Sequence, residues 1–416
     1  MDGGIARRPS SRPPRLLLWT LLAALLLAAA CDVGTSAELT PDGTPFQEPS
    51  PVPDAPPRPY LLGFSSVPAE RTEAGYRAAF SLAGQYGELV LIPRPLPWDE
   101  FRSGGSISGT TRDTTRVETE LARQYGLDLM VAVDPLDQAD RGRLANLPDR
   151  MRGMTFRDEE VRKAFVAYAK YVALNYKPRY LALGVDVDMY YDANPEDFQA
   201  FRSVYSEAYD AVKAVAPETQ VFVTFQLESL LGLLPWQSRH EPRWDVVQAF
   251  LPKLDVLAVS TYPGFVFSTV EQIPEQYYLQ LAQHAAGRPV GIVGSGFSSQ
   301  ETGAGINDGS EAQQEAFVRR LFADAERLGA GFVVWFASRD PAYQLERPFD
   351  LYASIGLQRS DGTAKPAWQA WLQQVTRPLA PREAGTPAPA ATPTAAPASP
   401  TPSTGSATPA PATPGQ

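Results

Sequence analysis

The strongest constraint on the fold of this chain is an alternation of short β-rich runs with helical segments between residues 60 and 375. Apolar, β-branched and aromatic runs predict strands, and apolar residues that recur every three or four positions predict helices. The clearest helix is predicted over Pro195–Ala216, with Asn194 as its N-cap and Pro195 at its first position. The eight predicted strands are Tyr60–Ser66, Glu88–Ile92, Leu127–Val133, Tyr180–Val185, Gln220–Phe225, Asp255–Ser260, Pro289–Val293 and Gly331–Phe336.

A helical segment follows nearly every predicted strand, although the fifth helix, near Arg243–Leu251, has a weak pattern. This order requires parallel strands joined by helical crossovers. Eight such units predict an α/β protein with one domain, a (β/α)8 TIM barrel. The alternative is a doubly wound open sheet. Such a sheet usually carries a glycine-rich phosphate loop after its first strand, and Gly63-Phe64-Ser65-Ser66 is not one.

The two ends of the chain differ in composition from its middle, because most of the 40 prolines are concentrated there. Residues 31–58 predict an extended proline-rich tether. Residues 377–416 consist mainly of Pro, Ala, Thr, Ser and Gly, which cannot bury enough apolar surface to fold and predict a disordered tail. The same composition is typical of O-glycosylated stalks, which is the alternative for the tail. The barrel is expected over residues 59–376.

Residues 1–30 have the organisation of a secretory signal. Arginines precede the apolar run Leu16–Ala30, which is short for a membrane span, and small residues lead directly to Cys31. Leu27-Ala-Ala-Ala-Cys31 resembles the bacterial lipobox, in which the cysteine is lipidated. The sequence therefore predicts an extracytoplasmic lipoprotein held on a bilayer through Cys31, at the bacterial cell surface or in the periplasm. A plain cleaved signal and an uncleaved anchor are the alternatives.

Composition excludes several classes of function. A single cysteine and two histidines, His240 and His284, in no ligand spacing argue against a disulfide framework and against a zinc or iron–sulfur site. No cofactor motif is present, so none is expected. The formal net charge is −10 and no basic stripe interrupts it, which makes nucleic acid a poor partner.

The chemistry of a (β/α)8 barrel resides on the loops that follow the carboxyl ends of its strands. In this chain those positions carry carboxylates and aromatic residues together. Aromatic rings stack on sugar rings, and carboxylates bind hydroxyl groups or transfer protons, so the combination indicates a polysaccharide or oligosaccharide ligand. The candidate catalytic residues are Asp186 and Glu228, and the candidate substrate-binding residues are Trp98, Asp134, Asp188, Gln226, Tyr262 and Trp335.

Two of these strand ends resemble clan A glycoside hydrolases, nearest the endo-β-1,4-galactanase type. Leu181-Ala-Leu-Gly-Val-Asp-Val-Asp188 is similar to the family's fourth strand, which reads roughly Gly-Asn-Glu-Val and carries the general acid/base. The resemblance places Val185 at the Asn and Asp186 at that Glu. Val259-Ser-Thr-Tyr-Pro263 is similar to the sixth strand, and the resemblance implies that Tyr262 lies near the nucleophile.

Two further strand ends carry the same resemblance. Arg288-Pro-Val-Gly-Ile-Val-Gly-Ser-Gly-Phe297 is similar to the seventh strand, Lys-Pro-Val-x-Ile-x-Glu-Thr-Gly-Trp, whose Glu is the nucleophile. Gly294 stands at that position. Trp335 fits the eighth-strand aromatic that forms the floor of the sugar subsite.

Glycine cannot act as a nucleophile, so the family's retaining mechanism, which needs two carboxylates about 5 Å apart, is not expected. The replacement carboxylates nearest the strand ends are Glu228, Asp134, Asp340 and Glu301. Three hypotheses stay open: a carbohydrate-binding barrel that has lost the standard catalytic pair; an active glycoside hydrolase, inverting or not, that uses Asp186 with Glu228 or Asp134; and a structural or protein-interaction lipoprotein that binds no sugar.

Overall fold

The computed structural model describes residue 52, residues 54–303 and residues 305–381. The predicted signal peptide, Cys31, most of the tether and most of the tail lie outside these residues. Among the described residues, no helix combines the length and the apolar character needed to cross a membrane.

Nine parallel strands form one sheet, and the prediction of a (β/α)8 barrel is confirmed. The strands are β1 (Leu61–Ser65), β2 (Leu89–Pro95), β3 (Asp128–Asp134), β4 (Tyr180–Leu183), β5 (Gln220–Phe222), β6 (Thr224–Gln226), β7 (Leu257–Thr261), β8 (Val290–Ser295) and β9 (Phe332–Trp335). Each predicted strand coincides with one of these, except that the fifth is divided into β5 and β6 at Val223.

The order of the strands excludes the alternative of a doubly wound open sheet. The sheet runs β5-β4-β3-β2-β1-β9-β8-β7-β6, so strands that are successive in sequence pair with each other, except β5 and β6, and β1 pairs with β9. The two ends of this order, β5 and β6, are successive in the chain. The sheet therefore closes on itself through the interrupted fifth strand, whose first half pairs with β4 and whose second half pairs with β7.

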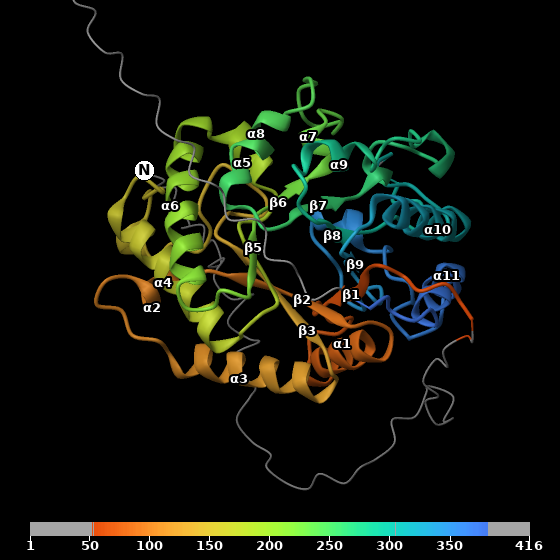
Figure 1. Cartoon of the computed structure of the whole chain (residues 1–416), viewed down its shortest axis with the longest axis horizontal. Coiled ribbons are helices and arrows are strands. Elements are labelled where there is room, and N and C mark those ends of the chain that lie inside the picture. Colours follow the sequence, from red (N-terminus) through yellow and green to blue (C-terminus); the bar gives the residue numbers. More distant parts are fainter. Residues whose placement is uncertain (1–51, 53, 304, 382–416) are drawn as a thin grey trace, which may run out of the picture. The chain divides into compact units, whose positions relative to one another are not determined.

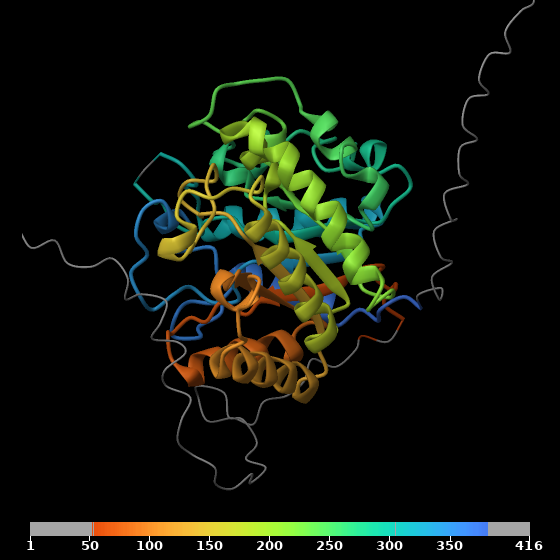
Figure 2. The same ribbon diagram turned by 90° about the vertical axis from the view of Figure 1, so that its left-hand side faces the viewer.

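Helices surround the strands on the outside (Figures 1 and 2). The longest, α6, begins as predicted, because the Asn194 side chain accepts a hydrogen bond from the Asp197 amide and Pro195 occupies the first turn. The weak fifth helix is a short α8 followed by a 3-10 turn at Leu251–Lys253. The helices are α1 (Glu73–Gln85), α2 (Trp98–Phe101), α3 (Gly109–Gln124), α4 (Glu159–Asn175), α5 (Val187–Ala193), α6 (Pro195–Lys213), α7 (Leu227–Leu230), α8 (Trp244–Gln248), α9 (Gln280–His284), α10 (Glu311–Leu328) and α11 (Pro366–Val375).

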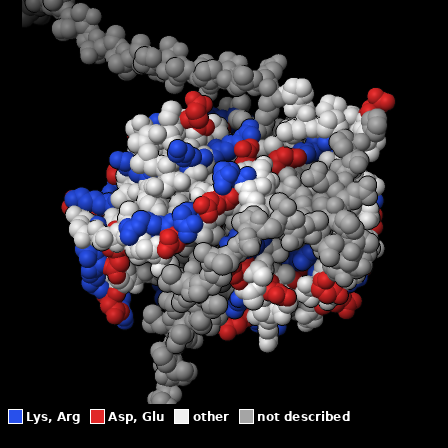
Figure 3. Space-filling model, turned by 90° about the horizontal axis from the view of Figure 1, so that it is seen from below, with Lys and Arg blue, Asp and Glu red and all other residues white. Residues whose placement is uncertain are grey.

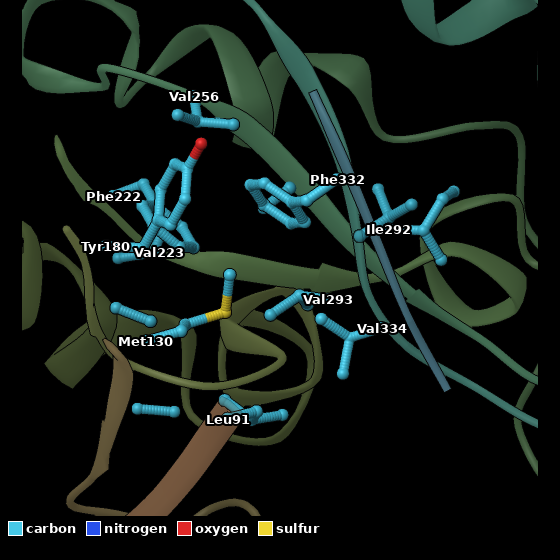
Figure 4. Close-up of a cluster of buried hydrophobic side chains, with 14 of the residues drawn as sticks. Leu91, Met130, Tyr180, Phe222, Val223, Val256, Ile292, Val293, Phe332 and Val334 are labelled. Atoms are coloured by element: carbon cyan, nitrogen blue, oxygen red, sulfur yellow. The ribbon is translucent and has the colours of Figure 1, made fainter. Parts of the chain in front are cut away.

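Bulky side chains fill the interior of the barrel, so it is a packed core and not a channel. Figure 4 shows Met130, Tyr180 and Phe332 among them. The rings of Tyr180 and Phe332 meet edge to face, with centroids 4.8 Å apart. Phe332 fits because β8 has glycine opposite it: a Cβ at Gly291 would lie 2.2 Å from the Phe332 ring.

The folded body extends beyond the predicted barrel at both ends. The Arg58 amide donates to the Pro378 carbonyl (2.9 Å), and the Ala380 amide donates to the Arg58 carbonyl (2.9 Å). Val52 similarly donates to the Thr376 carbonyl (3.0 Å). We call these paired segments, residue 52 with 54–58 and residues 376–380, the terminal strap. The predicted boundaries at 58 and 376 therefore cut through a paired structure, which a composition-based reading cannot detect.

Arg58 ties the terminal strap to the amino ends of β1 and β2. Its side chain is 2% exposed and donates to the carbonyls of Tyr60 (2.6 Å) and Gln374 (3.0 Å) and to the carboxylate of Glu88. A buried guanidinium is stable only when its donors are satisfied, and here both chain segments supply the acceptors.

We predict that Arg58→Ala lowers the free energy of unfolding by about 3 kcal/mol, because it removes one partner of a largely buried ion pair. Urea denaturation followed by circular dichroism measures this. The matched control is Arg77→Ala, whose ion pair with Glu73 is about half exposed on both sides and should cost less than about 0.5 kcal/mol. Equal effects of the two substitutions would show that the strap adds no stability.

Candidate active site

Asp186 lies where the carboxyl ends of β4, β6 and β7 converge. Its backbone is left-handed, with φ of 48°, so the chain turns sharply at the end of β4 before α5 begins. The Asp186 amide donates to Thr224 Oγ1 (2.8 Å), and the hydroxyls of Thr224 (3.1 Å) and Ser260 (2.8 Å) donate to Asp186 Oδ1. Oδ2 accepts no hydrogen bond from the described residues, so one carboxylate oxygen of this partly exposed residue is free for a ligand.

Arg141 brings a positive charge to the same end of the barrel. We call this end, where the carboxyl ends of the strands lie, the mouth. It donates to both carboxylate oxygens of Asp134, at 2.8 and 3.3 Å, and it also hydrogen-bonds the Val185 carbonyl immediately before Asp186. Burial raises the pKa of Asp186, and the Arg141 guanidinium opposes that rise. Sequence reasoning missed Arg141, because its approach to the end of β4 depends on the fold of the loop after β3.

Asp188 lies behind Asp186 and is 2% exposed. Its Oδ1 accepts a hydrogen bond from the Gln226 amide (2.8 Å), whereas Oδ2 has no partner among the described residues. Burial, and then the negative charge of Asp186, raises the pKa of Asp188 to about 7. Asp188 therefore joins the first turn of α5 to β6 and does not face the mouth as a substrate ligand would.

Glu228 is not the open rim carboxylate that the sequence predicted, because it is fully buried. Oε1 accepts hydrogen bonds from Thr261 Oγ1 (2.7 Å) and the Tyr277 hydroxyl (2.8 Å), and Oε2 accepts from the Tyr262 amide (3.1 Å) and from Gln226 Nε2. Burial raises the pKa of Glu228 against the effect of these donors. With no access to solvent and every lone pair directed at a donor, Glu228 holds loops together and cannot activate a water molecule.

The loops after β7 and β9 contribute a group of aromatic rings, which we call the rim aromatic cluster: Tyr262, Phe265, Phe336 and Tyr352. Tyr262 lies at its centre, with ring centroids 5.0 Å from Tyr352, 5.5 Å from Phe265 and 6.4 Å from Phe336. The Tyr262 hydroxyl makes no hydrogen bond to the described residues. Tyr262 and Phe265 are 6% and 5% exposed, and Phe336 and Tyr352 are partly buried, so the rings pack mainly on one another and only Phe336 and Tyr352 offer aromatic surface of any extent.

Gly294 lies beside that hydroxyl. A Cβ built on Gly294 would be 3.3 Å from the Tyr262 hydroxyl oxygen and 4.0 Å from Ser260 Cβ. Ser260 in turn donates to Asp186. A side chain at position 294 would therefore enter the mouth next to Tyr262 and on the same side as Asp186.

Neither predicted tryptophan presents a face to the mouth. Trp335 is fully buried, packs on Phe317 of α10 and donates from Nε1 to the Ile355 carbonyl (2.8 Å). Trp98 is 1% exposed and donates to the Ala145 carbonyl (2.7 Å). The eighth-strand aromatic at the rim is Phe336, one residue later, because successive side chains of a strand point to opposite faces.

The remaining predicted residues serve the framework of the loops. Gln226 caps α7 by accepting from the Ser229 amide. Asp340 forms a buried ion pair with Lys365 (2.7 Å), and Glu301 is exposed in the loop after β8. Among the described residues, no group of three or more His, Cys, Asp and Glu side chains is placed to hold a metal ion.

Asn307 is a second residue that sequence reasoning missed. It is 1% exposed and has a left-handed φ of 55°. Its amide donates to the Gly264 carbonyl (2.9 Å), its Nδ2 donates to the Leu351 carbonyl (2.7 Å), and its Oδ1 accepts from the Ser298 amide (3.3 Å). Through its backbone amide and its side chain, Asn307 therefore ties the loop after β8 to the loop after β7, which carries Tyr262 and Phe265, and to the loop after β9, which carries Tyr352.

Comparison with solved structures identifies the kind of barrel. The (β/α)8 barrel is similar in fold to solved structures of clan A glycoside hydrolases. Similar structures include GH5_18 from Streptomyces cattleya in complex with GlcNAc, with 19% identity, a TM-score of 0.55 and coverage of 77% of this chain and 81% of that chain. The Ignisphaera aggregans GH53 catalytic domain is 15% identical, with a TM-score of 0.53 and coverage of 78% and 98%.

A third similar structure is the exo-β-1,4-mannosidase Op5Man5 from Opitutaceae bacterium strain TAV5, with 16% identity, a TM-score of 0.56 and coverage of 76% of this chain and 59% of that chain. At such identities the likeness establishes the fold. Comparisons with protein-family models and with curated proteins gave no match.

We predict that the stability of the protein falls as the pH rises toward neutrality, and that Asp188→Asn weakens this dependence. Asp188 binds its proton more tightly in the folded protein than in the unfolded chain, where its pKa is near 3.8. Its contribution to stability is therefore complete at pH values below 3.8 and is lost as the pH rises through about 7. Asparagine imitates the protonated acid, so the free energy of unfolding of the variant should exceed that of the wild type at pH 8.

Urea denaturation at several pH values between 4 and 8 measures the effect. Asp113→Asn, which changes an exposed carboxylate on α3, is the matched control and should leave the profile unchanged. If Asp188→Asn behaves like this control, Asp188 does not hold a proton near neutral pH.

Proposed function

We propose that this chain is a membrane-anchored lipoprotein whose barrel binds carbohydrate and lacks the retaining mechanism of the galactanase family that its sequence resembles. The observation that supports the proposal is the arrangement of side chains at the mouth of the barrel. A single carboxylate with a free oxygen, Asp186, lies on the same side of the barrel as the rim aromatic cluster and the unpaired Tyr262 hydroxyl.

These groups suit a sugar. Aromatic faces stack on the C–H faces of pyranose rings, and hydroxyl and carboxylate oxygens bond sugar hydroxyls. A structural neighbour was solved in complex with GlcNAc, and this chain shares the fold of that protein. On the face drawn in Figure 3, acidic and basic side chains are interspersed and form no basic stripe that would favour nucleic acid.

The absence of a retaining mechanism follows from Gly294. The resemblance to the galactanase type puts the nucleophile at this position, and glycine has no side chain to attack the sugar. The unpaired Tyr262 hydroxyl beside it supports this assignment, since a carboxylate at position 294 would be within reach of that hydroxyl. Double displacement needs two carboxylates that face each other, and only one of the two, Asp186, is available at the mouth.

The alternative of an active hydrolase has less support. Of its two candidate partners for Asp186, Glu228 is buried with four donors, and Asp134 is held by both nitrogens of Arg141. The other alternative is a structural or protein-interaction lipoprotein. It does not account for the free Asp186 oxygen and the unpaired Tyr262 hydroxyl at the mouth.

We predict that the full-length protein binds glycans from a panel of β-linked oligosaccharides and releases no reducing ends. Asp186→Asn should weaken binding about tenfold, because it replaces a charged acceptor of sugar hydroxyls with a neutral one. Calorimetry measures binding, and a reducing-end assay on the same samples measures turnover.

Asp113→Asn is again the matched control, since its carboxylate is exposed on the outer helix α3. Turnover that disappears in Asp186→Asn would favour the hydrolase. No binding to any glycan would favour the protein-interaction lipoprotein.

The anchor is tested separately. When the chain is expressed in bacteria fed an alkyne-tagged fatty acid, we expect the wild type to be labelled and to remain in the membrane fraction. Cys31→Ser should be unlabelled, because serine offers no thiol for the lipid. A labelled Cys31→Ser protein would contradict the assignment of Cys31 as the attachment point.

A further inference from the structure

The pole of the barrel opposite the mouth has a groove at the amino ends of β3, β4 and β5, between the carboxyl-terminal ends of α3, α4 and α6. Four of the apolar residues that line it have accessible surface: Leu174, Val215, Ala216 and Pro217. Leu174, on α4, is 49% exposed. A leucine this exposed beside further apolar surface forms a patch, and apolar patches mark contacts with other molecules or with membranes.

Three exposed cations surround this apolar surface, and none of them forms an ion pair with the described residues: Arg123, Lys170 and Lys177. Lys170 lies one helical turn before Leu174 on α4. Arg123 lies in the last turn of α3, and Lys177 follows the end of α4. We call the four apolar residues and these three cations the basal patch.

The backbone at Lys177 is strained. Its φ is 49°, in the left-handed region, and it directly follows the helix cap Tyr176, where glycine is the usual residue. The next carbonyl in the chain, that of Pro178, accepts a hydrogen bond from Thr219 Oγ1 (2.8 Å), which fixes the turn. A charged side chain is therefore held at the basal patch at a position that disfavours it.

Few acidic groups oppose these cations. Asp128 lines the groove but is paired with Arg179, so Glu218 is the one unpaired carboxylate among the described residues that line it. In the adjoining groove along α4, Glu159 and Glu207 are each paired with a neighbouring cation. The basal patch is therefore locally positive on a chain whose formal net charge is −10, and the partner that it fits is anionic.

The chain leaves the described body toward Cys31 at the same pole. Val52 belongs to the terminal strap, which pairs with the amino ends of β1 and β2. The groove adjoins the strap, because the Asp128 amide donates to the Glu88 carbonyl (2.8 Å) and the Glu88 carboxylate binds Arg58. A lipid on Cys31 would therefore hold the basal patch at a high local concentration of lipid headgroups.

We propose that the basal patch is a contact surface for a bilayer that contains anionic lipids. The cations bind lipid phosphates and Leu174 enters the headgroup region, so the anchored barrel lies on the membrane by its amino-end pole and its mouth faces away. The inference rests on the anchored lipoprotein of the proposed function. It adds a second contact with the membrane and an orientation of the barrel.

The test uses the full-length protein, purified in mild detergent and placed in vesicles of phosphatidylcholine alone or of phosphatidylcholine and phosphatidylglycerol in equal parts. Leu174→Cys carries a nitroxide label at the patch. Trp236→Cys, in the loop between α7 and α8, is the matched control, because Trp236 is also 49% exposed. Electron paramagnetic resonance measures how far each label is exposed to oxygen and to a water-soluble nickel chelate, and the unsubstituted protein gives any signal from Cys31.

On the anionic vesicles, the label at position 174 should be shielded from the chelate and exposed to oxygen, whereas on neutral vesicles it should stay in water. The label at position 236 should stay in water on both.

Replacing the three cations together should lower the ratio of membrane-contacting to free barrels about a hundredfold, because each cation near an anionic bilayer contributes about a fivefold factor. The variant combines Arg123→Gln, Lys170→Gln and Lys177→Gln. High salt should act in the same direction. The matched control removes three exposed cations from the loops after β3 and β9 and should keep the shielding: Arg143→Gln, Arg152→Gln and Arg347→Gln.

A label at position 174 that stays in water on anionic vesicles, while the protein floats with them, overturns the membrane contact and leaves the proposed function intact. Equal shielding on neutral vesicles overturns the role of the cations. Shielding without vesicles would mean that another segment of the chain covers the patch or, if dilution abolishes it, a second copy, and either result overturns the inference. Failure of the wild type to float with any vesicles overturns the proposed anchor and this inference with it.

Discussion

The buried carboxylate of Glu228 is the interaction on which the mouth of the barrel depends. A carboxylate without solvent is costly to bury unless donors surround it, and here four donors come from β6, the end of β7 and the segment before α9. The Tyr262 amide is one of them, so Glu228 sets where the central ring of the rim aromatic cluster lies. Through Gln226, whose backbone amide donates to Asp188, the same network reaches the start of α5, just after β4.

This network separates two roles that look identical in a sequence. Asp186 and Glu228 both follow the end of a strand, and both are acidic. Asp186 keeps one oxygen free, because only two hydroxyls, both bonded to Oδ1, hold its carboxylate. Glu228 has no free oxygen and no exposed surface. The difference between a candidate reactive group and a structural one lies in the donors that neighbouring loops supply.

The fold could be predicted from the sequence because its signals are local: alternation of strands and helices, helical periodicity, and the cap at Asn194. The site could be predicted only in part. Asp186 and Tyr262 were found from strand-end motifs. Arg141 and Asn307 were not, because their partners lie on other loops; Asn307, for example, bonds Leu351, 44 residues away. Trp335 was misplaced by one position, since neighbouring strand residues face opposite sides.

The terminal strap makes the two ends of the barrel differ in how they would respond to a pulling force. It pairs with the amino ends of β1 and β2, at the pole of the barrel opposite the mouth. A pull transmitted to Val52 along the chain would load the backbone hydrogen bonds of the strap and the Arg58–Glu88 pair first. The loops that carry Asp186 and Tyr262 lie outside that load path. In the lipoprotein that we propose, force on the attachment would therefore reach the terminal strap before it reached the mouth.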